Sequence, residues 1–245
     1  CYGKPVSYGI RRAEFDQYLL QHSGVRQLLG EPVVTLARQG DGWLVNGRIE
    51  ARLLIGAGGH FCPVARFLGA RISQEDAIVA MVAEFAMSPE QERCCPVQAD
   101  TPALYFCRDL LGYGWLFRKG SCLNVGLGRL DRHGGGEHVS AFQTFLEQRG
   151  ELPPTLAAQF QGHAYLLYGG KNPRTTVADG ALLIGDAAGM AHRQSGEGIL
   201  PAIESANLAA DTVIAVNGDY RRASLESYEA CLAGRFSNGG RERAS

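Results

Sequence analysis

The residues with the clearest chemical potential lie between positions 181 and 210. Four apolar residues lead into Gly185 and Asp186, a small-residue turn follows, and the tripeptide at 196–198 opens a long amphipathic segment. This order predicts a buried strand, a loop whose backbone approaches a ligand closely, and a helix N-terminus directed at the same place. A carboxylate at a strand end can accept hydrogen bonds from sugar or ribityl hydroxyls, and a helix N-terminus offers free N–H groups. The arrangement suits a flavin nucleotide.

Four segments together resemble a known family. Residues 181–210 are similar to the second FAD motif of the para-hydroxybenzoate-hydroxylase superfamily, and within it to the geranylgeranyl-reductase-like branch. Residues 8–20 (YGIRRAEFDQYLL) resemble the strand-to-helix segment of that branch, with its Arg-x-x-Phe-Asp core. Residues 112–128 contain GYGWLFRKG and NVGLG, which resemble its aromatic substrate-pocket strand. With LLIGAGGH at 53–60, these segments cover most of the chain.

The resemblance assigns FAD-binding roles to the loop and helix at 185–198. It implies that Asp186 binds the ribityl chain of FAD, and the flanking Gly185 and Gly189 favour close approach of the cofactor. The alternative for Asp186 is a helix N-cap, a position that Asp fills well. The resemblance also implies that the helix start directs its dipole at the pyrimidine edge of the flavin ring. The residues of that helix start are Gly196, Glu197 and Gly198. The family usually has Pro where Arg193 stands, so this loop departs from the family pattern.

Two further cofactor contacts are expected from the other motifs. Arg12 matches the family arginine that lies against FAD, and its alternative is a surface salt bridge with Asp16 four residues later. Gly58 and Gly59 match an Asp-Gly motif, with Gly58 in place of the aspartate. The same segment could be read as a dinucleotide turn, but Phe61 stands where a third glycine would be needed. Arg66, further along, is either a phosphate contact or a solvated helix residue.

Three aromatic residues alternate along one predicted strand. Because successive strand residues point to opposite sides, Tyr113, Trp115 and Phe117 share one face. The resemblance implies that this face forms the wall of a pocket for a long apolar substrate. The alternative is a sheet face that packs its own core. The usual Phe-Pro-Lys of the family reads Phe-Arg-Lys at 117–119, so the family specificity does not transfer directly.

Composition narrows the class of protein. The chain has 245 residues, 45% hydrophobic and 20% charged, with a net charge of −1. A globular protein fits these values, whereas a nucleic-acid-binding protein would be expected to show a basic face. Seven cysteines show no metal-ligand spacing, which indicates reduced thiols and no metal site. We therefore expect a cytoplasmic protein, and an apolar substrate would allow peripheral membrane contact.

One feature of the family is missing from the sequence. No Gly-x-Gly-x-x-Gly, the turn that holds the ADP half of FAD, occurs in the 245 residues. We expect the sequence to be a piece that lacks an N-terminal nucleotide-binding unit. The alternative is a complete protein with an unusual start.

The fold expected is an α/β (α+β) mixture, in which an incomplete Rossmann-like FAD-binding domain is interleaved with a β-sheet substrate domain. The partial FAD-binding domain is assigned to 11–71 and 171–216, the substrate domain to 1–10 and 72–170, and a C-terminal helix with a flexible tail to 217–245. Periodicity predicts strands at 6–10, 32–37, 43–46, 49–55, 78–87, 103–107, 113–118, 122–129 and 163–168, and helices at 11–22, 62–68, 138–148 and 225–232.

Taken with the resemblance, these features predict an FAD-dependent oxidoreductase that reduces carbon–carbon double bonds of an apolar, isoprenoid-like substrate. The first alternative is an FAD-dependent monooxygenase or hydroxylase of the same superfamily. The second is a truncated fragment without productive FAD binding. NADPH and a ferredoxin-like protein are both open as electron donors. No general acid or base can be named, because in such enzymes the flavin carries the hydride chemistry.

Overall fold

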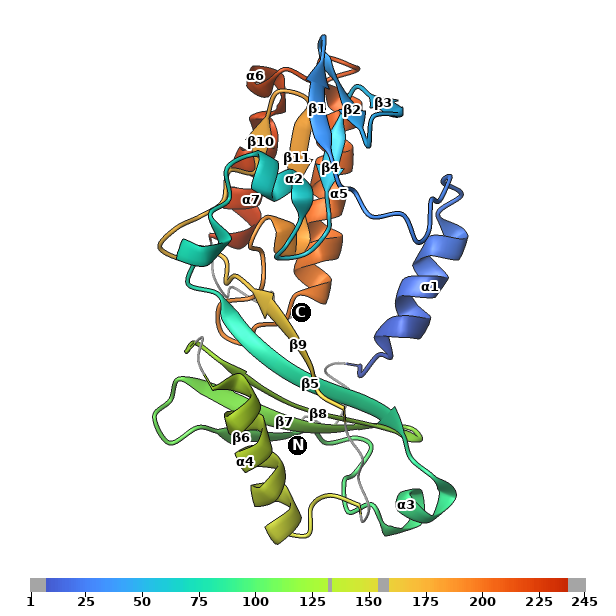
Figure 1. Ribbon diagram of the computed structural model, residues 1–245, viewed down its shortest axis with the longest axis vertical. Helices are drawn as coiled ribbons and strands as arrows, with labels where there is room; N and C mark the ends of the chain where they lie inside the picture. Colours follow the sequence, from blue (N-terminus) through green and yellow to red (C-terminus); the bar gives the residue numbers. More distant parts are fainter. Residues whose placement is uncertain (1–7, 132–133, 154–158, 238–245) are drawn as a thin grey trace, which may run out of the picture. The chain divides into compact units, whose positions relative to one another are not determined.

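The computed structural model describes residues 8–131, 134–153 and 159–237, which form two compact units (Figure 1). Within these ranges, the first unit contains residues 8–30 and 78–163, and the second contains residues 31–77 and 164–237. Each unit is therefore built from segments that are far apart in the sequence. The mixed α/β fold agrees with the prediction.

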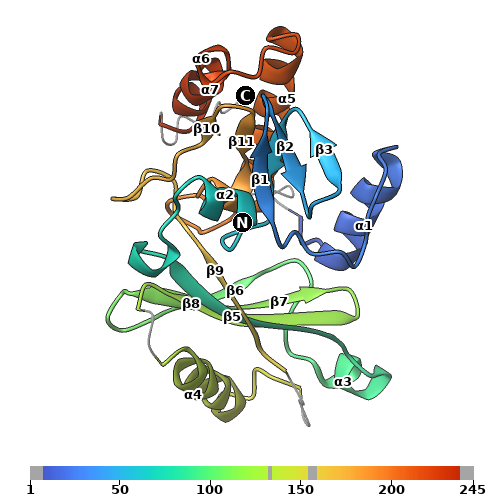
Figure 2. The same ribbon diagram turned by 45° about the horizontal axis from the view of Figure 1, so that its top comes forward.

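A five-stranded sheet in the order β6-β7-β8-β5-β9 dominates the first unit. Its strands are β5 (Ile78–Ala86), β6 (Ala103–Phe106), β7 (Gly112–Lys119), β8 (Cys122–Arg129) and β9 (Gln161–Tyr165). The four strands β6, β7, β8 and β5 pair antiparallel. Helix α4 (Gly135–Gln148) lies against this sheet, as Figure 2 shows. Its buried residues Val139, Phe142 and Leu146 complete a core with Leu123 and Val125 of β8.

Two more helices belong to the first unit. Helix α1 (Arg12–His22) confirms the predicted helix, but it buries none of its residues. Its Leu19 and Leu20 are each 45% exposed. Helix α3 (Pro89–Cys94), which was not predicted, begins with a capping box in which Ser88 and Gln91 satisfy each other's backbone N–H groups.

Two three-stranded sheets form the centre of the second unit. One sheet, in the order β1-β2-β3, contains β1 (Leu36–Gln39), β2 (Gly42–Val45) and β3 (Ile49–Ala51). The other, in the order β10-β11-β4, contains β4 (Leu54–Gly56), β10 (Val177–Ala178) and β11 (Ala181–Leu183). Strands β11 and β4 are parallel, with Leu183 opposite Gly56. Their carboxyl ends therefore lie at the same edge of the sheet.

Helices lie around the β10-β11-β4 sheet, and strand β11 is completely buried. They are α2 (Pro63–Phe67), α5 (Ile199–Ala215), α6 (Arg222–Leu225) and α7 (Ser227–Phe236), with the 3-10 turns η1 (Ile72–Gln74) and η2 (Gly185–Ala187). The hydroxyl of the buried Tyr228 donates to the Leu183 carbonyl at 2.9 Å. Trp43, 1% exposed, donates from its indole nitrogen to the Gly180 carbonyl at 2.6 Å. These bonds join strand β11 and its turn to both a helix and the neighbouring sheet.

The structure corrects several predicted elements. The single strand at 49–55 is wrong: β3 pairs with β2, and β4 begins at Leu54 in the other sheet, because its neighbour is the parallel β11. The single helix at 225–232 is divided by Glu226 into α6 and α7. The strand at 6–10 falls partly outside the described residues, and residues 8–10 are not a strand. The predicted tail from 235 lies largely outside the described residues, although Arg235 and Phe236 belong to α7.

The compact units and the predicted domains are not divided in the same way. Residues 11–30, expected with the FAD-binding segments, group with the five-stranded sheet. The functional assignment of the segments stays a prediction. Among the described residues, no helix is both long and apolar enough to cross a bilayer.

Candidate functional site

The candidate site lies where strands β4 and β11 end. Because the two strands are parallel and in register, the turn at Gly58 and Gly59 and the turn at Gly185 and Asp186 emerge from the same edge of the sheet. The Ile184 N–H also donates to the Gly56 carbonyl at 3.0 Å, which extends the pairing to the start of the turn. In parallel α/β sheets, ligands bind outside the carboxyl ends of the strands. The two motifs that were assigned to FAD from sequence therefore meet in space.

Asp186 lies in the 3-10 turn η2, directly after β11, and its side chain faces the start of α5. A Cβ atom placed on Gly198 would lie 3.1 Å from Oδ1 of Asp186. Gly198 therefore leaves room for the carboxylate beside the first turn of α5. The half-buried carboxylate and the helix N-terminus form one polar corner, as the sequence predicted.

Two glycines of this segment are required by their conformation and surroundings. Gly196 has φ +69°, and a Cβ there would come within 2.5 Å of the Tyr165 hydroxyl oxygen. Gly185 has φ +55°, and a Cβ there would lie 3.0 Å from that of Ala202 on α5. Its N–H donates to the Ser205 hydroxyl at 2.9 Å. Any larger residue at either position would strain the backbone and collide with a neighbour. Gly189 also has a positive φ, of +72°.

Glu197 already caps the helix that the sequence analysis expected to offer free N–H groups. Its Oε1 accepts hydrogen bonds from the N–H groups of Ile199 and Leu200, at 2.6 and 2.9 Å. A carboxylate at a helix N-terminus is favoured by the helix dipole. The first amides of α5 are therefore held by the protein itself, and Glu197 must move if a ligand is to use them.

The turn after β4 combines backbone freedom with close packing. Gly59 has φ +70° with open space around its Cβ position, and a Cβ on Gly58 would lie 3.3 Å from Cys62 Cα. A Cβ on Gly56 would be only 2.5 Å from the Leu183 side chain. The same Cβ would lie 2.9 Å from Cβ of Val64 on α2, so helix and strand pack closely at Gly56. A dinucleotide turn has such close helix–strand packing at its third glycine. Arg66 is exposed on α2.

A buried arginine, which the sequence analysis did not identify, connects the two turns. Arg174 pairs bidentately with Glu75: Nε donates to Oε1 and Nη2 to Oε2, each at 2.7 Å. Nη2 also donates to the His60 carbonyl at 2.8 Å, and Nη1 donates to the Ala187 carbonyl at 3.0 Å. The three side chains of Arg174, Glu75 and His60 are at most 5% exposed. We call these three residues the arginine clamp.

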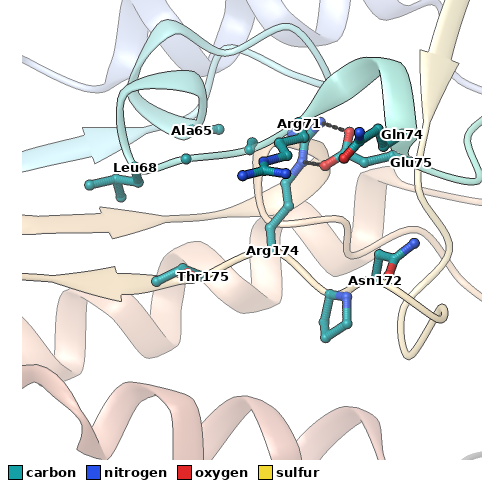
Figure 3. A pocket seen from close by; sticks show the side chains of 11 residues that line it. Ala65, Leu68, Arg71, Gln74, Glu75, Asn172, Arg174 and Thr175 are labelled. Carbon is teal, nitrogen blue, oxygen red and sulfur yellow. Dashed lines mark hydrogen bonds and ion pairs between the residues drawn. The ribbon is translucent and has the colours of Figure 1, made fainter.

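A pocket of about 230 Å³ opens beside the clamp (Figure 3). Figure 3 shows Arg174 reaching from the loop before β10 to Glu75 at the pocket wall. The pocket is lined by Ala65, Leu68, Gly69, Ala70, Arg71, Gln74, Glu75, Asn172, Pro173, Arg174 and Thr175. Asp186 and the start of α5 are not among these residues, so the pocket is separate from the polar corner.

The aromatic residues of β7 form a ladder in the first unit. The ring centroids of Tyr113 and Trp115 are 5.8 Å apart, and those of Trp115 and Phe117 are 6.5 Å apart. Leu116, between them in sequence, points to the opposite face and is buried in the core. The indole nitrogen of Trp115 donates to Asn124 Oδ1 at 2.7 Å. The ladder is half-buried, and burial raises the pKa of the Tyr113 hydroxyl.

Arg12 forms the salt bridge that its spacing allowed. Its Nε and Nη2 donate to the two carboxylate oxygens of Asp16, at 3.1 and 3.0 Å. Both side chains are about half exposed, at 61% and 48%. Arg12 belongs to the first unit and Asp186 to the second, so a shared FAD contact stays a prediction.

His60 and His192 take structural positions. His60 is 4% exposed, and its Nδ1 lies 3.2 Å from Arg174 Nη2. The exposed His192 uses Nδ1 within its own turn, 3.4 Å from the Ser195 hydroxyl oxygen. In the described part of the chain, no three His, Cys, Asp or Glu side chains are grouped as a metal site.

Comparison with solved structures defines the class of fold. The structure matches a geranylgeranyl bacteriochlorophyll reductase-like protein from Thermoplasma acidophilum with a TM-score of 0.73 and 22% identity, covering 95% of this chain and 63% of that one. It matches the flavin-dependent halogenase CmlS with a TM-score of 0.66 and 20% identity, over 93% of this chain and 44% of that one. The fold is therefore one that geranylgeranyl-reductase-like proteins share with flavin-dependent enzymes of the monooxygenase and halogenase type.

Comparison with known sequences names the relatives. The chain is 26% identical to digeranylgeranylglycerophospholipid reductase of Methanocaldococcus jannaschii, in an alignment that covers 92% of this chain and 60% of that protein. It is 29% identical to the Methanococcus aeolicus protein of the same name, over 84% of this chain and 54% of that protein. No family model matches the chain. The chain thus spans little more than half the length of these relatives, and the resemblance to geranylgeranyl-reductase-like proteins is confirmed.

Proposed function

We propose that this chain carries the flavin-binding and substrate-facing parts of an FAD-dependent oxidoreductase of geranylgeranyl-reductase type. The observation that supports this most strongly is the convergence of the two glycine-rich turns and Asp186 at the carboxyl ends of β4 and β11. The corner fits the riboflavin half of FAD, because a partly exposed carboxylate stands beside the start of α5 and the facing turn has open space at Gly59. The relatives with reductase names support the same conclusion.

Each residue of the corner has a defined task in this proposal. Asp186 accepts hydrogen bonds from the ribityl hydroxyls, and Gly59, whose Cβ position faces open space, keeps a side chain out of the path of the cofactor. The other glycines of the two turns, Gly58, Gly185 and Gly189, let the backbone pack closely against its neighbours. Gly198 leaves room for the Asp186 carboxylate and Gly196 for the Tyr165 hydroxyl at the start of α5, where the helix dipole favours electron-rich atoms once Glu197 has moved. FAD, when bound, supplies hydride transfer, which the protein residues do not perform themselves.

The substrate in this proposal is a long apolar molecule with carbon–carbon double bonds, of the isoprenoid type. The half-buried ladder of Tyr113, Trp115 and Phe117 offers a continuous aromatic surface for such a chain. The names of the relatives point to geranylgeranyl groups on lipids. NADPH and a ferredoxin-like protein are both open as electron donors, and the cytoplasmic location also remains a prediction.

A reduction assay tests this proposal. The protein is loaded with FAD, reduced with dithionite without oxygen and mixed with a geranylgeranyl-ether lipid. We expect product masses that rise by one hydrogen molecule for each reduced double bond. A Trp115→Leu variant should lose most of this product while keeping its FAD absorbance. Unchanged lipid in the presence of bound, reduced FAD would contradict the proposed substrate class.

A monooxygenase is the second candidate, because solved structures of similar fold include a probable FAD-dependent monooxygenase from Pseudomonas aeruginosa, with a TM-score of 0.54. Oxygen consumption that depends on added substrate, with an oxygenated product, would favour this candidate. If the purified protein has no flavin absorbance and takes up no added FAD, the chain is a fragment without productive FAD binding.

A further inference from the structure

We infer that Arg174 is a positioning residue that couples the two cofactor turns, an inference that rests on the proposed flavin site. The argument starts from the acceptors that the guanidinium group contacts. One carbonyl belongs to His60, directly after Gly58 and Gly59, and the other belongs to Ala187, directly after Asp186. One planar guanidinium group therefore sets the distance between the end of one turn and the end of the other.

The type of residue matters for this task. Arginine presents five N–H donors in a planar fork, which can serve a carboxylate and two carbonyls together. Glu75 fixes the orientation of the fork through the bidentate pair. Lysine, with one flexible ammonium group, could neutralise Glu75 but could not reproduce this set of directions.

Burial strengthens the argument. The Arg174 side chain is 1% exposed and the Glu75 side chain is 5% exposed. Buried ion pairs are weak contributors to stability compared with apolar pairs of similar size, and they are retained in some proteins for structural specificity. Because Arg174 bonds one carbonyl in each of the two turns, the structure that the clamp specifies is the spacing between these turns.

The test separates positioning from stability. The double variant Arg174→Met/Glu75→Leu replaces the ion pair with an apolar pair, and its thermal midpoint should fall less than that of Glu75→Ala, because no charge is left buried without its partner. We expect its dissociation constant for FAD to rise about tenfold, because a turn held by charge-assisted hydrogen bonds is released on each side of the site. Arg71→Ala, which removes an exposed arginine of the same pocket, is the matched control and should change neither value.

Hydrogen exchange provides a readout that does not need FAD. The hydrogen-bonded amides of Cys62, Ala188 and Gly189 report on the two turns. In the double variant they should exchange faster together, whereas the Asn46 amide, which is bonded to the Thr35 carbonyl next to the β1-β2 pair, should not change. Arg174→Lys should show the same selective loss of protection and serves as the test if the double variant fails to fold.

Each result decides between the accounts. Unchanged exchange in both turns, or faster exchange throughout the second unit, would overturn the positioning role. Unchanged FAD affinity in a folded double variant would also overturn it. If the wild-type protein binds no FAD, the proposed function fails, and the exchange of the apoprotein still decides whether Arg174 couples the turns.

Discussion

Two arginine–carboxylate clusters, one in each unit, have similar chemistry in different surroundings. In the second unit, the Arg174 and Glu75 side chains are 1% and 5% exposed. In the first unit, Arg129 pairs with Asp109 and Asp131, whose side chains are 48% and 32% exposed, while that of Arg129 is 10% exposed. Arg129 is bonded to two carboxylates near the end of β8, at 2.8 Å to Asp109 and 2.6 Å to Asp131.

The difference in burial between the two clusters shows that the number of ion pairs alone does not predict their contribution to stability. Exposed pairs gain little because water screens the charges, whereas a buried charge that loses its partner is strongly unfavourable. Arg129 keeps the pKa values of both aspartates below their ordinary range through its hydrogen bonds. We therefore expect the first cluster to tolerate substitution of either exposed aspartate, because the other still pairs with the buried Arg129, and the clamp to tolerate only the loss of both charges.

The largest effect is expected for Glu75→Ala. The change leaves the Arg174 guanidinium buried without its carboxylate and should lower the free energy of unfolding by about 3–5 kcal/mol. Denaturant unfolding followed by circular dichroism measures the loss. Asp109→Asn in the exposed cluster is the matched comparison and should have a much smaller effect. Equal losses in the two variants would break the comparison.

The second effect concerns crowding at two glycines with the same backbone conformation. Gly196→Ala and Gly59→Ala both place a Cβ at positive φ, which costs about 1–2 kcal/mol in each case. At Gly196 the new methyl group also meets the Tyr165 hydroxyl, which should add about 1–3 kcal/mol, whereas Gly59 has open space. Thermal unfolding of the two variants tests the difference. A Gly59→Ala variant less stable than Gly196→Ala would contradict the packing described for these turns.

A smaller effect is expected at alkaline pH in the first unit. Burial, together with the hydrogen bond to Glu151, raises the pKa of Tyr105 to about 12 from 10.0. A raised pKa favours the folded state below pH 10, and this contribution disappears as the pH rises from about 10 to about 12. The stability difference between the wild type and Tyr105→Phe should therefore shrink over that range in urea titrations. A constant difference would show that the Tyr105 hydroxyl does not titrate with folding.

The smallest effect is expected at acid pH in the exposed cluster. Because the pKa of Asp131 is lowered by hydrogen bonds from Arg129, its contribution to stability is present above the ordinary pKa of 3.8 and is lost as the pH falls below it. Asp131→Asn should remove this part of the acid dependence, with little change at neutral pH. A large loss of stability at neutral pH would place this cluster in the same category as the clamp.

Much of the fold could be predicted from local patterns. The alternation in β7 and β8 and the helical periodicity of α4 were sufficient to place these elements within a few residues. The division of 49–55 into β3 and β4 could not be predicted, because no Gly or Pro interrupts the segment and only pairing with the distant β11 separates the strands. The helix α1 was also predicted, but its sequence does not reveal that the structure buries none of its residues.

The candidate site was also predicted only in part, because some of its residues form a local motif and others come together only in the fold. Asp186 and the glycines form a contiguous motif, so local sequence identifies them. Arg174 and Glu75 are 99 positions apart and have no motif of their own, so only the fold brings them together. The cap formed by Glu197 could have been anticipated from an acidic residue just before a helix.

The central claim, that the corner around Asp186 binds a flavin, is tested most directly by FAD titration monitored by quenching of flavin fluorescence. The wild type and Asp211→Ala, which removes an exposed carboxylate from α5, should bind FAD with equal affinity. Asp186→Ala should bind at least about tenfold more weakly, through loss of hydrogen bonds to a charged acceptor. Equal affinity of Asp186→Ala and Asp211→Ala, or no binding by the wild type, would contradict the claim.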